Sequence, residues 1–143
     1  MNFTLHKQTT LFLLALTSFG YIHGTKIVFP NKIYQDTEWT KAEKEKNIAF
    51  KNLAHTKQSS SHLVRIKGQE VPHYHDSHSS IVTVISGKSI LHFKDLDVTI
   101  EAGDVVNIPK GTYHWAENVD ANATVVFVTF FPAYKGKDKR LAK

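Results

Sequence analysis

The chain of 143 residues contains no cysteine. This absence excludes disulfide bonds, thiolate metal ligands and a cysteine nucleophile. It also excludes a bacterial lipoprotein, because the lipid of such a protein is attached to a cysteine at the end of its leader. There is no internal repeat and no low-complexity segment, and the length suits one domain with a substantial core.

The sequence also lacks an apolar run that could cross a bilayer, which takes about 20 residues. Its most apolar stretch, residues 9–20, is shorter and follows a weakly basic start. This pattern predicts that residues 1–24 form a hydrophobic leader helix, a secretory signal peptide cleaved after Gly20 or Gly24. The mature protein would then be secreted or periplasmic, with no stable insertion in a membrane. A helix buried within the domain is the alternative.

The basic excess of the chain is not spread over one face. The formal net charge is +5, and residues 135–143 carry a cluster of basic side chains. These are Lys135, Lys137, Lys139, Arg140 and Lys143. The basic residues lack interleaved aromatic residues and any nucleic-acid-binding motif. We therefore predict a solvated basic tail at 135–143 and no nucleic-acid partner.

From Asn47 onward, short β-rich runs alternate with turn residues. The runs are Ile48–Leu53, His62–Lys67, Ser80–Ser86, Ser89–Phe93, Val98–Ile100, Val105–Ile108, His114–Asn118 and Thr124–Phe131. Such a series of short strands predicts an all-β fold, an antiparallel sandwich or barrel, over residues 59–134. Residues 25–58 are expected to hold N-terminal strands and a polar connection, with at most one helical turn, capped by Asp36.

Two of these runs, residues 81–85 and 125–131, are apolar at consecutive positions. A strand with one solvated face would alternate apolar and polar residues, so both faces of these strands are expected to be covered. One face would line the interior of a barrel. The other would pack in a dimer or beneath a loop.

Three histidines occur within six residues, directly after the predicted strand His62–Lys67. In an extended chain, residues two apart point to the same face, so His73 and His75 are expected to project together. Two adjacent imidazoles can hold a metal that prefers nitrogen ligands, provided that a third ligand comes from elsewhere. His114 is the best candidate, and the nearby His78 is a possible fourth nitrogen ligand.

The segment 103–118 has the spacing G-x5-P-x-G-x2-H-x3-N, with His114 as its histidine. This segment resembles the second conserved motif of the cupin superfamily. The first motif of that family, G-x5-H-x-H-x3,4-E-x6-G, is matched by His73, His75 and Gly87, whereas Gly68 stands one position closer than usual. The resemblance covers about residues 60 to 131. It implies a small single-domain cupin, which is a double-stranded β-helix or jelly-roll barrel.

One position departs from the family motif. Counting back from Gly87, the place of the family's glutamate ligand is taken by Ser80, and a serine hydroxyl is a poor ligand for a divalent ion. The resemblance therefore implies a metal site of neutral imidazoles, His73, His75 and His114. His78 would either join them or hydrogen-bond a substrate or a ligand histidine from the rim. The ion could be Fe, Mn, Zn, Ni or Cu.

A site without a ligand carboxylate should favour anionic molecules bound at the metal. The resemblance therefore suggests a three-histidine, metal-dependent oxygenase or dioxygenase that acts on a small anionic organic substrate. A non-catalytic cupin that binds a metal or a small ligand is the alternative, and a sugar isomerase or epimerase is a weaker one. A homodimer is expected, because a lone small barrel leaves edge strands to cover.

Overall fold

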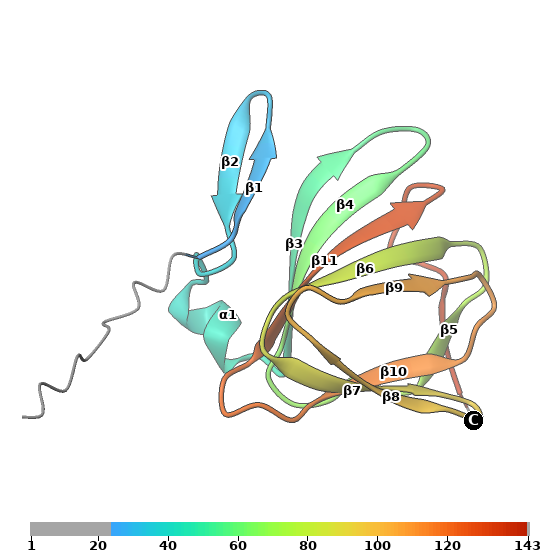
Figure 1. Cartoon of the computed structure of the whole chain (residues 1–143). Helices are drawn as coiled ribbons and strands as arrows, with labels where there is room; N and C mark the ends of the chain where they lie inside the picture. Colours follow the sequence, from blue (N-terminus) through green and yellow to red (C-terminus); the bar gives the residue numbers. More distant parts are fainter. Residues whose placement is uncertain (1–23, 143) are drawn as a thin grey trace, which may run out of the picture.

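Twelve strands and one short helix make up residues 24–142, the part of the chain that this computed structural model describes (Figure 1). The elements are β1 (Lys26–Phe29), β2 (Lys32–Gln35), α1 (Lys41–Glu45), β3 (Ile48–His55), β4 (Ser60–Ile66), β5 (His73–His75), β6 (Ser79–Ser86), β7 (Lys88–Phe93), β8 (Asp97–Glu101), β9 (Val105–Ile108), β10 (His114–Asn118), β11 (Thr124–Phe131) and β12 (Lys139–Leu141). The predicted signal peptide lies, apart from Gly24, outside the described residues. Within 24–142, no helix has the length and apolar character needed to span a membrane.

Ten of the strands form two five-stranded sheets that face each other (Figure 1). The strand order is β3-β4-β11-β6-β9 in the first sheet and β12-β5-β10-β7-β8 in the second, and all pairs are antiparallel. From β4 onward, the chain passes repeatedly from one sheet to the other. This topology is the double-stranded β-helix, so the predicted all-β jelly-roll barrel is confirmed.

The eight predicted strand runs correspond to β3, β4 and β6 to β11, and no end is shifted by more than two residues. Two differences concern the ends of the domain. The cap of α1 is Thr40 rather than Asp36, because the Thr40 hydroxyl accepts from the Glu43 amide while the Glu43 carboxylate accepts from the Thr40 amide. The region 135–143, predicted to be a solvated tail, contains β12, which pairs with β5.

The main core lies between the two sheets. Its buried members are Val64, Ile66, Val84, Leu91, Ile100, Ala116, Val126, Val128 and Phe130. A second apolar cluster covers part of the outer face of the first sheet, where Trp39 packs with Ala49, Leu63 and Val125. The apolar character of β11 on both faces is thus explained within one chain, by the interior on one side and the N-terminal segment on the other.

A tight turn after β6 places β7 in the second sheet. Gly87 has a φ of 83°, a left-handed conformation that glycine adopts without steric cost. A Cβ at this position would lie 2.7 Å from Thr124 Cα, so a side chain has no room here. The turn is therefore specific for glycine, as its place in the first motif predicts.

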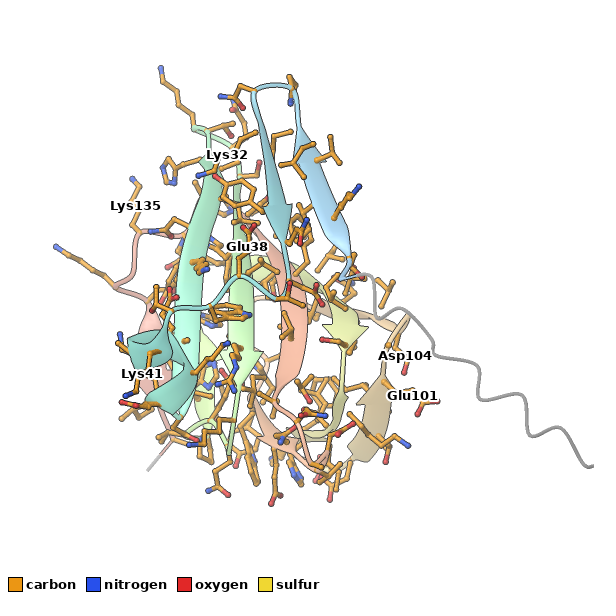
Figure 2. The ribbon with its side chains drawn as sticks, turned by 90° about the vertical axis from the view of Figure 1, so that its left-hand side faces the viewer. Lys32, Glu38, Lys41, Glu101, Asp104 and Lys135 are labelled. Carbon is orange, nitrogen blue, oxygen red and sulfur yellow. The ribbon has the colours of Figure 1, made fainter. Side chains whose placement is uncertain are left out.

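The N-terminal segment 24–46 lies on the outside of the first sheet. The hairpin β1–β2 extends away from the barrel (Figure 1). Its exposed Lys32 lies over the Tyr34 ring, and Lys41 is exposed on α1 (Figure 2). Trp39, between the hairpin and α1, is 8% exposed. The segment therefore covers part of the outer face of the first sheet.

Candidate metal centre

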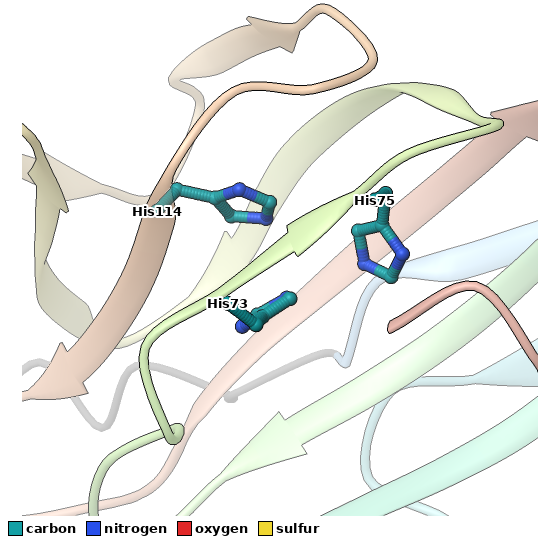
Figure 3. Close-up of side chains that lie close together, drawn as sticks. All are labelled: His73, His75 and His114. Carbon is teal, nitrogen blue, oxygen red and sulfur yellow. The ribbon is translucent and has the colours of Figure 1, made fainter. Parts of the chain in front are cut away.

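Strands β5 and β10 bring three histidines together. The β5 alternation buries His73 and His75, and His114 is the register partner of His73 across the strand pair. The three rings converge from these two strands (Figure 3). One nitrogen from each ring lies within 4.8 Å of the others. The sequence prediction that these residues meet at one point is therefore confirmed.

Hydrogen bonds fix which nitrogen each ring presents. His73 Nδ1 lies 2.9 Å from the Val71 carbonyl, and His114 Nδ1 lies 2.9 Å from the Thr112 carbonyl. His75 Nδ1 lies 3.1 Å from the Asp138 carboxylate. A carbonyl or carboxylate oxygen only accepts, so each Nδ1 must carry the proton. The lone pair of each Nε2 is then free for a metal ion.

The donor set fits a divalent transition metal. Nitrogen ligands about 2.1 Å from an ion lie roughly 3 to 3.5 Å apart, so at most small side-chain rotations are needed. Burial lowers the pKa of His73 to about 3 and that of His114 to about 4, and it also lowers the pKa of His75. All three rings are therefore neutral near pH 7, which is the form that binds metals.

His78 is not brought into this group. Its Nδ1 faces Asp138 and its Nε2 lies 3.1 Å from the Ala133 carbonyl, so both nitrogens are directed at oxygen acceptors. Its ring is 7% exposed and adjoins Phe130 and Tyr134. Within residues 24–142, His78 is linked to the three histidines through Asp138, which contacts both His78 and His75.

Ser80, at the position of the family's glutamate, is 3% exposed on β6. It lines a small inner cavity of about 80 Å³ together with the three histidines. Ser80 is therefore close to the predicted metal ligands, as expected for the position at which other cupins carry a glutamate ligand.

A wider cavity of about 720 Å³ lies on the outer side of the centre, and His73 and His75 line both spaces. Its other lining residues fall into an aromatic and aliphatic group and a polar group. The first comprises Ile48, Phe50, Ala54, Val64, Phe130 and Tyr134, and the second Asn52, His55, His62, Glu70, Lys135 and Lys139, with Gly136 between them. The centre thus lies where a ligand-sized, largely apolar cavity meets the barrel interior.

Glu70 is the one carboxyl residue, within the described chain, that lines both cavities. One of its oxygens accepts from the Ala116 amide at 3.2 Å, and the other lies 3.9 Å from Lys139 Nζ. Burial raises its pKa, against the opposing influence of the Lys139 cation and the Ala116 amide. The position of Glu70 relative to the cavity depends on the loop before β5, so the sequence alone does not place it there.

Asp138 was missed at the sequence level. Its carboxylate bridges His75 and His78 and accepts from the Ser77 amide at 3.1 Å. Burial opposes its ionisation, but the hydrogen bonds from both histidines and from that amide outweigh this effect and lower its pKa. The signal available in the sequence was a single acid among the basic residues of 135–143, which charge counting alone treats as a minor exception.

Two other histidines lie away from the centre. His92 points outward, stacks on Trp115 at a centroid distance of 3.8 Å and hydrogen-bonds Asp97. His62 lines the outer cavity, with its two nitrogens bonded to Asn52 and to Ser60. Burial, with a smaller effect from His55, lowers the pKa of His62 to about 4.

A closed jelly roll with three convergent histidines is the arrangement of a small metal-binding β-barrel. Comparison with known families agrees, since the model of the cupin domain matches residues 62–131. The chain belongs to the cupin family. An uncharacterized protein of Aquifex aeolicus (strain VF5) is 36% identical over 115 residues, which span 78% of this chain and 94% of the relative.

Solved structures of the same fold include KdgF from a Halomonas species. It is 25% identical, with a TM-score of 0.57 over 62% of this chain and 82% of that one. An RmlC-like cupin from Shewanella frigidimarina is 21% identical, with a TM-score of 0.56 over 62% and 79%. The Streptomyces nucleoside dehydratase Pac13 is 17% identical, with a TM-score of 0.58 over 68% and 79%. The last two likenesses concern the fold alone.

Proposed function

We propose that this cupin is a metal-dependent enzyme of the oxygenase type, which holds a divalent transition metal through His73, His75 and His114. Its substrate would be a small anionic organic molecule. The observation that carries the proposal is that two of the three convergent imidazoles, those of His73 and His75, line a cavity of about 720 Å³. A purely structural histidine cluster would need no such access.

The charge and shape of the cavity support an anionic substrate. Lys135 and Lys139 line the cavity and would attract a carboxylate or enolate toward the centre. Phe130 and Tyr134 stack at a centroid distance of 4.8 Å and offer an apolar wall for the rest of the molecule. A bound divalent ion would supply Lewis acidity, or redox chemistry with dioxygen, at this point.

Glu70 is the candidate for proton transfer in this reaction. Its carboxyl group faces the same space as His73 and His75, and the Ala116 amide holds one of its oxygens. Asp76 is turned away, since it pairs with Arg140 on the exposed side, and Glu117 lies beside the outward-pointing His92. Glu70 could therefore take a proton from a substrate or return one to a product.

Metal analysis and turnover test the proposal. The purified full chain should contain about one transition-metal ion per chain, and His75→Ala and His114→Ala should each lose it. His92→Ala, which removes a histidine from the outer surface, is the matched control and should retain it. Oxygen uptake should then be measured with a panel of diketones, thiols and aromatic carboxylates, and turnover should also be measured with a panel of sugars.

The outcomes separate the candidate functions. Stoichiometric metal with oxygen uptake on one substrate class supports the oxygenase. Metal without turnover across the panel supports the non-catalytic binding protein, and turnover of a sugar without oxygen uptake supports an isomerase or epimerase. A chain that acquires no metal under any condition contradicts the whole proposal.

Two further parts of the proposal concern location and assembly. We propose that residues 1–24 direct export, so that the mature protein is secreted or periplasmic. N-terminal sequencing of the mature protein should find a start after residue 20 or 24. We also propose a homodimer, and light scattering that gives the mass of one chain would contradict it.

A further inference from the structure

The three predicted ligands differ in what holds their Nδ1 atoms. His73 and His114 each bond the backbone carbonyl two residues earlier, so their orientation is set by the loop that directly precedes each strand. His75 instead bonds a side chain 63 residues later in the chain, Asp138. Its orientation is thus the only one of the three that depends on a distant segment.

Asp138 is itself held on several sides. The Ser77 amide donates to its second oxygen at 3.1 Å, and His78 Nδ1 faces that same oxygen. His78 is in turn anchored at the Ala133 carbonyl. The Asp138 side chain is 10% exposed, so this carboxylate is a fixed, largely desolvated partner for His75 rather than a mobile surface group.

The segment that carries Asp138 is fastened to β5 by strand pairing. In β12, Lys139 is the register partner of His75 and Arg140 that of Tyr74. The Arg140 guanidinium makes two contacts with Asp76, at 2.7 and 2.9 Å, and lies over the Tyr74 ring. The contacts of Arg140 lie on the outer side, whereas Asp138 reaches the inner side.

We propose that Asp138 is a positioning residue of the metal centre, which fixes His75 with its Nε2 directed at the ion. Ser80 supplies no carboxylate ligand to the ion. The Asp138 carboxylate would instead act on the centre by hydrogen-bonding a ligand histidine, from a segment outside the cupin match at 62–131. This inference rests on the proposed metal site. It makes the C-terminal segment part of that site rather than a tail.

The tautomer of His75 tests the proposal without any metal. In the metal-free wild-type chain, ¹⁵N NMR of the imidazole rings should find His75 protonated at Nδ1. In Asp138→Asn, the new amide oxygen can accept from only one of the two histidines, so His75 should populate both tautomers. His73 and His114 should keep the Nδ1–H form in both proteins, because their acceptors are backbone carbonyls.

Zinc affinity, measured by competition with a chelator, gives a second readout. Asp138→Asn should weaken Zn²⁺ binding by about 10- to 100-fold, the range found for outer-shell partners of ligand histidines. Asp138→Glu keeps the charge and should recover part of the loss. Arg140→Gln disturbs the same segment on its outer side and should leave affinity and the His75 tautomer unchanged.

These measurements distinguish failure of the proposed role of Asp138 from failure of the proposed metal-dependent function. If wild-type protein does not bind zinc or another transition metal, the proposed function fails, while the tautomer of His75 still tests the link to Asp138. Wild-type affinity and an unchanged His75 tautomer in Asp138→Asn would overturn the inference alone. If Asp138→Asn does not fold, the wild-type chain still tests the proposal, because a His75 ring protonated at Nε2 in the metal-free protein would contradict it.

Discussion

Two segments lie outside the region matched by the cupin family, one on each side of it in the sequence, and their roles differ. The N-terminal segment 24–46 packs Trp39 and Ile27 against the outer face of the first sheet. The C-terminal segment 133–142 adds β12 to the second sheet and places Asp138 against His75. The first contact is apolar and distant from the centre, whereas the second is polar and inside it.

The difference lies in what each segment buries. Trp39 is 8% exposed, so it removes a large aromatic surface from water, and such burial stabilises a fold without requiring one orientation. All three residues of β12 are exposed, so this strand buries little and adds little to stability. The C-terminal segment instead acts through one oriented contact, because the hydrogen bond between Asp138 and His75 fixes both the orientation of the imidazole ring and its tautomer.

The largest expected effect comes from removing the apolar contact of the N-terminal segment with the first sheet. Trp39→Ala should lower the free energy of unfolding by about 3 to 5 kcal/mol, the usual range for removing a buried aromatic residue. Zinc affinity of the remaining folded protein should be unchanged. Chemical denaturation and chelator competition measure the two quantities.

A matched control for Trp39 is available in the same segment. Val28 is 68% exposed on the hairpin, and Val28→Ser should change stability by no more than about 0.5 kcal/mol. A Trp39 variant with normal stability, or with weakened zinc binding, would contradict the division of roles between the two segments.

Protonation of histidines should destabilise the cavity side and not the N-terminal segment, because residues 24–46 contain no histidine. His62 has a pKa of about 4 in the folded protein and 6.5 in the unfolded chain. The unfolded chain therefore binds the extra proton between these values, so stability is lost as the pH falls from 6.5 towards 4. His62, which is 2% exposed, should contribute at most about 3 kcal/mol to this loss.

The contribution of His62 is measured by difference. Unfolding free energies of the metal-free wild type and His62→Gln should be compared at several values between pH 4 and pH 7. The variant should lose less stability on acidification, while the remaining slope comes from the buried histidines of the centre. Equal slopes for the two proteins would show that His62 does not carry a lowered pKa.

Truncation of the chain removes the polar contact between the C-terminal segment and His75. A chain that ends at Gly136 lacks Asp138 and β12, and it should bind zinc about 10- to 100-fold more weakly than the full chain. Its stability should fall much less than that of Trp39→Ala. A chain without Lys143 alone serves as the control, and a truncated protein with full zinc affinity would leave the C-terminal segment without a role in the centre.

The smallest expected effect follows from returning a carboxylate to the inner cavity. Ser80→Glu should tighten zinc binding by about tenfold, which is about 1.4 kcal/mol. It should also make the centre less dependent on the C-terminal segment, so that Asp138→Asn costs less in this background. Equal costs of Asp138→Asn in both backgrounds would mean that the two carboxylates act independently.

Much of the fold was predictable because local patterns and fold agree. The turn at Gly87 needs a residue without a side chain, and the alternation around Tyr74 alone places His73 and His75 on one face. The cap of α1 was less predictable, since both Asp36 and Thr40 are residues that commonly cap helices. The choice depended on Glu43, which completes the capping box only with Thr40.

The sequence by itself determined the strands, the barrel and the pairing of His73 with His75, since these follow from side-chain periodicity and turn chemistry within a few residues. The cupin motif also predicted that His114 meets them. Only the tertiary structure decided that His78 turns to Asp138 and that an acid in a basic segment holds His75. Such contacts join residues up to 63 positions apart. Their formation depends on how two sheets close on each other, which no local pattern records.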